Sequence, residues 1–219
     1  MIKIGNNISE FSTYSCQPKT KDELKKIIKD RISKECTNYD LNDIDTSLIT
    51  DMSCLFYGSD FTGDISKWNT SNVKDMTLMF AFSSFDNDIS NWNTSNVKLM
   101  QGMFLYSNFN TDISNWDTSK VENMKEMFAH SMFNGDLSSW DVSNVKEMEH
   151  MFSYSNFNCD ISRWDVSKVK NASSMFSNSK FSHDISKWKI DKKCDIREMF
   201  DNCLIKYEFK PKSVHKCSR

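Results

Sequence analysis

The sequence predicts an α/β fold, a right-handed solenoid of 24-residue coils with one short parallel strand and one short helix per coil. Tryptophan recurs every 24 residues, and the other large apolar residues recur in phase with it. Each repeat also contains apolar residues at helical spacing and a short polar–apolar–polar segment typical of a half-buried strand. A fixed period of this length indicates stacked repeats.

The apolar columns are counted from each tryptophan as repeat position 0. The tryptophans are Trp68, Trp92, Trp116, Trp140, Trp164 and Trp188. Valine occupies position 5, methionine positions 8 and 11, phenylalanine positions 12 and 17, and isoleucine or leucine position 21, with few exceptions. With a degenerate repeat that starts at Ile44, these columns contain 11 of the 13 methionines and 13 of the 16 phenylalanines. We therefore expect them to form the core.

Each element of the coil has its own signal. Apolar positions 5, 8, 11 and 12 predict a helix over positions 4 to 13, which the serine at position 3 would cap. The Asp-Ile-Ser segment at positions 20 to 22 predicts the strand. Successive strands would pair about 4.8 Å apart in a parallel sheet, with the helices on the opposite side.

The chain divides into five parts. Thr20 and Glu23 form a capping box, and Leu24, Ile27 and Ile28 begin the apolar stripe of the helix that follows. The expected parts are a lead segment over 1–19, a helical capping coil over 20–43, six repeats over 44–187, a C-terminal capping coil over 188–205 and a basic tail over 206–219.

Composition excludes several classes of function. The net charge of −2 and the pI of about 6.1 argue against a nucleic-acid binder. The chain has no apolar run of about 20 residues that could span a membrane, and its first residues lack the apolar core of a secretory signal. Five glycines leave no phosphate-binding loop.

Histidines and cysteines give no catalytic or metal pattern. His130, His150, His183 and His215 occupy unrelated repeat positions or the tail, so we expect solvated surface side chains. The seven cysteines include no C-x-x-C pair, which favours free thiols in a reducing compartment, although one bridge inside a cap stays open. We expect no enzymatic activity, no catalytic residue, no metal and no cofactor.

An aspartate column occupies position 20. Its members are Asp64, Asp88, Asp112, Asp136, Asp160 and Asp184, each followed two residues later by serine. Carboxylates about 5 Å apart would repel one another unless each has a partner. The favoured interpretation is a structural ladder in which each aspartate accepts hydrogen bonds from its own turn. The alternative is a stripe that binds cations, but the glycine-rich turns of calcium-binding coils are missing.

Two variable columns are candidates for binding, because specificity in a repeat scaffold is expected where positions vary. Position 23 holds Lys67, Asn91, Asn115, Ser139, Arg163 and Lys187. Position 14 holds the potential aromatic anchors Phe82, Tyr106, His130 and Tyr154. The alternatives are an ordinary solvated sheet face for the first column and rings that close the core for the second.

The repeat W-[ND]-[TV]-S-x-V-x-x-M-x-x-M-F-x-x-S-x-F-x-x-D-I-S-x resembles that of the BspA-like surface-protein family, which includes mycoplasmal lipoproteins. The resemblance extends over about residues 17–205, because tryptophan, Met-Phe and Asp-Ile-Ser all recur in phase. It implies a leucine-rich-repeat-like solenoid that binds partners, often at the bacterial cell surface, and no enzymatic activity.

Two functions therefore stay open. The favoured one is a monomeric, non-enzymatic scaffold that presents a rigid face to a protein or glycan. The alternative is a structural protein that assembles through coil faces or ends, although both ends look capped. The resemblance suggests the cell surface, whereas the odd number of cysteines and the lack of a signal allow the cytoplasm.

Overall fold

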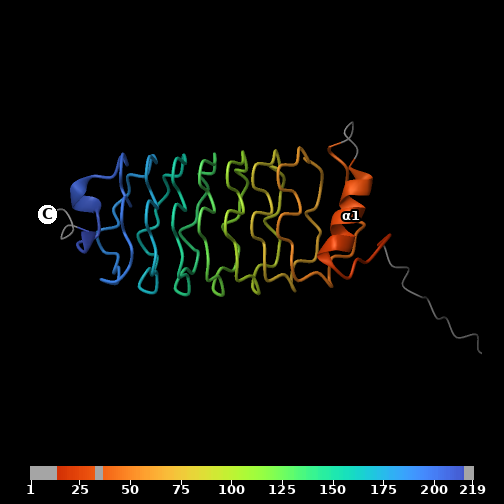
Figure 1. Cartoon of the computed structure of the whole chain (residues 1–219), viewed down its shortest axis with the longest axis horizontal. Coiled ribbons are helices and arrows are strands. Elements are labelled where there is room, and N and C mark those ends of the chain that lie inside the picture. The colour runs from red at the N-terminus through yellow and green to blue at the C-terminus, as the bar shows by residue number, and fades with distance from the viewer. Residues whose placement is uncertain (1–13, 33–36, 215–219) are drawn as a thin grey trace, which may run out of the picture.

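The computed structural model describes residues 14–32 and 37–214, which form a nearly straight stack of coils (Figure 1). Each coil is one repeat, so residues 24 positions apart lie beside one another, as Trp68 and Trp92 do. The described residues contain one α-helix, α1 (Lys21–Arg31), and one 3-10 helix, η1 (Tyr207–Phe209). Neither is long and apolar enough to cross a membrane.

Helix α1 covers the N-terminal end of the stack (Figure 1). As predicted, the Thr20 hydroxyl accepts a hydrogen bond from the Glu23 backbone N–H, at 3.2 Å, and caps the helix. Leu24 and Ile28 are buried, which closes the core at this end. Lys21 forms an ion pair with Asp51 of the first coil, at 2.8 Å, which ties the cap to the repeats.

The coils are joined by backbone hydrogen bonds over repeat positions 7 to 14. Single-residue parallel β-bridges at position 7 run without a break from Asp51 to Asp195. Beyond each bridge, four alternate N–H groups donate to carbonyl oxygens of the next coil. In the Trp68 coil the donor–acceptor pairs, at 2.8–3.0 Å, are Met76–Leu99, Leu78–Gln101, Phe80–Met103 and Phe82–Leu105. The backbone of one coil thus supports the next.

The helix expected over positions 4 to 13 is not present, which corrects the sequence analysis. Residues at positions 10 and 14 have φ between +51° and +63°, which a right-handed helix cannot accommodate. The N–H groups of Met79 and Ala81 instead bond to carbonyls three residues back, at 3.2 and 3.3 Å, and so form turns. Packing explains the difference, because a helix about 10 Å wide cannot repeat in a straight stack at about 4.8 Å.

The strand expected at positions 20 to 22 is also absent, and the parallel pairing lies at position 7 instead. In the Asp-Ile-Ser segment the N–H of Ser66 donates to the Asp64 side chain, at 2.8 Å. That donor is consequently unavailable to a neighbouring coil. The burial that the alternation predicted is nevertheless correct, since Ile65 and its equivalents are inside.

The core consists of the predicted columns, one ring or methionine stacked on its copy in the next coil. Trp68 to Trp188 are 3–5% exposed, and each indole N–H donates to a carbonyl of the previous coil, as Trp92 does to Ile65 at 3.1 Å. Ring centroids of Phe80 and Phe104 lie 5.8 Å apart. Continuous burial along the axis is what stabilises a repeat protein whose single units cannot fold alone.

The C-terminal end is covered by residues 206–214, which include η1 (Figure 1). The N–H of Ile185 donates to the carbonyl of Phe209, at 3.0 Å. The Lys210 ammonium lies 5.3 Å from the centre of the Phe200 ring, which is the end of the phenylalanine column. Both ends of the apolar stack are therefore covered.

Candidate functional site

A row of exposed aromatic side chains runs along the outside of five successive coils. We call it the aromatic stripe, and its members are Tyr57, Phe82, Tyr106, His130 and Tyr154. The tyrosines and Phe82 are 47–56% exposed, and His130 is half-buried between its neighbours. Adjacent ring centroids lie 4.1–5.5 Å apart. The rings stack on those of neighbouring coils, as the alternative interpretation expected, but they remain about half exposed and do not close the core.

The backbone explains why the stripe is continuous. Phe82, Tyr106, His130 and Tyr154 have φ of 52–56°, a left-handed conformation that costs a residue with a Cβ roughly 1–2 kcal/mol. The N–H of each donates to the next coil, as Tyr106 does to Ala129 at 2.9 Å. The same turn repeats in every coil and so places each ring above the previous one. Gly58, Asn178 and Asn202 occupy the same position in other coils, and these residue types favour that conformation.

Tyr57 was missed by sequence reasoning. It stands at repeat position 13, immediately before Gly58, and its ring nevertheless lies 5.5 Å from that of Phe82. Alignment by column assigns Gly58 to the stripe and passes over the aromatic neighbour. A search for aromatic residues at position 14 or one residue to either side of it would have identified Tyr57.

His130 is the titratable member of the stripe. Burial between the rings of Tyr106 and Tyr154, with centroids at 4.1 and 4.5 Å, lowers the pKa of His130, and the nearby His150 lowers it further. Both effects disfavour the imidazolium form. The stripe is therefore apolar and uncharged in the neutral form of His130, with tyrosine hydroxyls as its polar groups.

The other predicted column, at position 23, is also exposed. It contains Lys67, Asn91, Asn115, Ser139, Arg163 and Lys187. The described residues show no hydrogen bond, ion pair or ring contact between this column and the aromatic stripe. Its backbone lies next to the turn that the aspartate column forms, and Ser139 donates from its hydroxyl to the Ser114 carbonyl, at 2.7 Å. The structure thus gives two separate exposed columns.

The aspartate column has the hydrogen bonds that the structural interpretation expects. Each carboxylate of Asp64, Asp88, Asp112, Asp136, Asp160 and Asp184 accepts from the backbone N–H two residues later, at 2.8–2.9 Å. For Asp112 this backbone N–H of Ser114, followed by the Ser114 hydroxyl, lowers the pKa of the carboxyl. The described residues contain no group of three or more side chains arranged to hold a metal ion.

The described histidines and cysteines form no cluster that could hold a metal ion. His183 contacts the Asn158 carbonyl at 2.9 Å, while His215, Cys36 and Cys217 lie outside the described residues. The five described cysteines are free, and burial raises the pKa of Cys194 to about 11. A thiol with so high a pKa is a poor nucleophile.

The comparisons with known proteins are consistent with the repeat architecture. The sequence profile of a family described as Mycoplasma protein of unknown function, DUF285, matches residues 23–132 and again residues 105–210. No match was found among the curated proteins or among the solved structures. The two matched segments together run from the first turn of α1 through the last coil. The chain therefore belongs to this Mycoplasma repeat family of unknown function.

Proposed function

We propose that the protein is a non-enzymatic binding scaffold whose aromatic stripe contacts an extended segment of a partner protein. The observation that supports the proposal is the row of five rings, which leaves a continuous apolar surface exposed on a regular stack. Contiguous exposed apolar surface marks interaction sites, and tyrosine is enriched among binding anchors. In this proposal the chain is a right-handed solenoid related to the BspA-like surface proteins.

The packing of the rings favours a polypeptide over a glycan. Sugars bind aromatic side chains through an open ring face, yet Tyr106, His130 and Tyr154 stack with interplanar angles of 6–8°. Neighbouring rings cover both faces of Tyr106 and His130 and one face of Tyr154, so the exposed parts are mainly ring edges and tyrosine hydroxyls. Ring edges carry partial positive charge, which suits carbonyl and carboxylate oxygens of a peptide.

Preorganisation is the second physical argument. Four of the five stripe residues, Phe82 to Tyr154, are each fixed by a backbone hydrogen bond to the next coil, so little backbone conformational entropy remains to be lost on binding. The rings also repeat along a nearly straight axis, which fits an extended chain better than a compact ligand (Figure 1). Coverage of both ends favours this function over assembly through the ends of the stack, and we propose a monomer.

A matched pair of triple variants tests the proposal. Phe82→Asn, Tyr106→Asn and Tyr154→Asn remove three rings and keep a residue type already present at this position, as in Asn178. The control removes three exposed leucines elsewhere, Leu48→Asn, Leu99→Asn and Leu204→Asn, at positions where other coils carry asparagine. Linear peptides are selected from a random display library on the unmodified protein, and their affinities are measured by fluorescence anisotropy.

We expect the selected peptides to bind the stripe variant at least about tenfold more weakly and the control almost unchanged, since aromatic anchors dominate binding energy. Equal affinity for the two triple variants would contradict the proposal. So would a selection that yields no peptide while neutral oligosaccharides bind through the stripe.

A further inference from the structure

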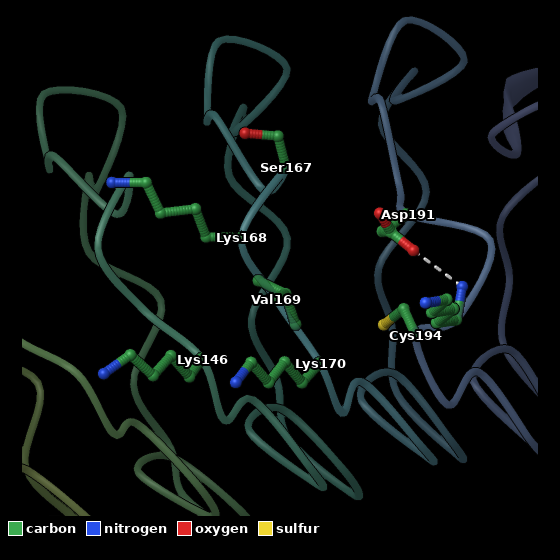
Figure 2. Close-up of a pocket in the computed structure, with 8 residues that line it drawn as sticks. Lys146, Ser167, Lys168, Val169, Lys170, Asp191 and Cys194 are labelled. Carbon is green, nitrogen blue, oxygen red and sulfur yellow. Dashed lines mark hydrogen bonds between the residues drawn. The ribbon is translucent and has the colours of Figure 1, made fainter.

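The repeat also forms a second exposed surface, which consists of lysine side chains rather than aromatic rings. Positions 4 and 6 flank the buried valine of position 5, so their side chains point outward when the valine points inward. In the Trp164 coil this arrangement is Lys168-Val169-Lys170, with both lysines exposed and Val169 3% exposed. Figure 2 shows Lys146 and Lys170 extending side by side from successive coils.

These lysines line two adjoining hollows of about 440 and 470 Å³. The hollows share Lys146 and Lys168, so they form one channel along the stack axis, which we call the lysine groove. Its lysines are Lys98, Lys120, Lys146, Lys168, Lys170 and Lys193. The rest of the lining includes Ser119, Asn144 and Ser167 together with the apolar Val169 and Cys194.

The charges of the groove are only partly compensated. Glu122 and Asp191 are the carboxylates of the lining, and Glu122 pairs with Lys146. The ammonium groups of Lys120 and Lys168 donate to asparagine oxygens, at 2.7 Å. The nearby carboxylates of Asp117 and Asp165 attract them without forming an ion pair. The ammonium groups of Lys98, Lys170 and Lys193 have no hydrogen-bond or ion-pair partner among the described residues. A protein of net charge −2 thus concentrates positive charge along one channel.

We propose that the lysine groove binds a linear sulfated polysaccharide. The lysines are distributed over successive coils and do not converge on one point, so a small anion could contact only a few of them. A chain with regularly spaced sulfates could follow the stack and contact all of them. Lysine suits this ligand because it acts as a flexible point charge and needs no bidentate geometry.

The lining favours a glycan over a nucleic acid. Proteins that bind single strands add aromatic platforms on which bases stack, and neither hollow contains an aromatic residue. The hydroxyl and amide groups of Ser119, Asn144 and Ser167 instead offer partners for sugar hydroxyls. This site is separate from the aromatic stripe, and neither proposal depends on the other.

Binding of a labelled heparin octasaccharide, measured by fluorescence anisotropy at low salt, tests the site. The loss variant is Lys146→Gln, Lys168→Gln and Lys170→Gln. Its control, Lys25→Gln, Lys26→Gln and Lys29→Gln, removes the same charge from exposed positions of α1. A gain variant, Glu122→Lys, places lysine where Lys98 and Lys146 already stand in neighbouring coils. The gain variant remains informative even if the loss variant folds poorly.

We expect the loss variant to bind about tenfold more weakly, the control to change less than about twofold, and the gain variant to bind several-fold more tightly. These differences should shrink as salt is raised. Equal weakening in the loss variant and the control would show dependence on net charge alone and overturn the proposal. Single-stranded DNA of equal charge that binds as tightly as heparin, or failure of heparin to bind, would overturn it as well.

Discussion

Two aromatic columns of this protein stand only two residues apart and behave in opposite ways. At position 12, Phe80, Phe104 and their copies are completely buried except at the ends of the stack, whereas Phe82 and Tyr106 at position 14 are about half exposed. Both columns stack ring on ring. Centroids lie 5.5–5.8 Å apart in the first column and 4.1–4.9 Å apart over Phe82 to Tyr154 in the second. Stacking therefore does not distinguish core from surface, and the path of the backbone does.

The comparison separates stability from recognition. The buried column loses water on all sides and contributes the hydrophobic free energy that holds coils together. The exposed column keeps a left-handed backbone conformation at each residue, which opposes folding, and leaves half of each ring available to a partner. Substitutions at position 12 should consequently lower stability, whereas substitutions at position 14 should mainly affect binding.

The largest effect is expected for Phe104→Ala. Removal of a fully buried ring from the centre of the stack should lower the free energy of unfolding by about 3–5 kcal/mol, because a cavity replaces contacts with both neighbouring coils. Chemical denaturation followed by tryptophan fluorescence measures the change. A loss below about 1 kcal/mol would mean that position 12 is not the core.

An intermediate effect on the free energy of unfolding is expected in the aspartate column, which is on the surface and contains no rings. Asp112→Ala should destabilise the protein by about 1 kcal/mol, because the Ser114 N–H loses its acceptor, and Asp112→Asn should cost less. The lowered pKa means that this contribution is present above the unfolded pKa near 3.8 and is lost as pH falls through the folded value.

The same column offers a test for metal. A chelator should leave the melting temperature unchanged, because the carboxylates already accept hydrogen bonds from their own turns. Recovery by calcium of a melting temperature that the chelator had lowered would make the aspartate column a cation stripe.

A small effect is expected in the aromatic stripe, and its sign depends on the new residue. Tyr106→Asn should change the free energy of unfolding by less than about 1 kcal/mol, since loss of ring stacking is offset by easier left-handed geometry. Tyr106→Gly should be more stable than Tyr106→Ala, the reverse of the order in a helix. Denaturation of the three variants in parallel gives the order, and a more stable alanine variant would contradict the assigned backbone.

The smallest effect is the pH dependence of the stripe. Because the pKa of His130 is lowered on folding, its contribution to stability is present above the unfolded value near 6.5 and is lost as pH falls through the folded value. His130→Asn should flatten the fall in melting temperature below about pH 6.5. A variant whose melting temperature falls as steeply as that of the unmodified protein would exclude His130 as the cause.

The core and the N-terminal cap could be predicted from the sequence. The core follows from the 24-residue period of the apolar residues, and the cap follows from the residue types at the start of α1. Burial of the tryptophan, methionine and phenylalanine columns follows from recurrence alone, and Thr20 and Glu23 carry a local capping signal. The helix failed because apolar positions 5, 8, 11 and 12 fit two consecutive turns as well as they fit a helix. Only the spacing between coils, a property of the whole stack, decides between them.

The candidate sites were partly predictable for the same reason. Variation at position 14 identified Phe82, Tyr106, His130 and Tyr154, but their exposure depends on left-handed residues that bulky side chains rarely adopt. The lysine groove went unnoticed because its lysines are spread over positions 4, 5 and 6 and form no single column. That these positions lie on one face of the stack can be seen only from the path of the backbone in each coil.

Hydroxyl-radical footprinting of the native protein tests the comparison between the two columns most directly. Phe80 and Phe82 have the same intrinsic reactivity, so their oxidation rates report only how far water reaches each ring. The structure predicts rapid oxidation of Phe82, which is 47% exposed, and protection of the fully buried Phe80. Equal rates, or faster oxidation of Phe80, would contradict the assignment of position 12 to the core and position 14 to the surface.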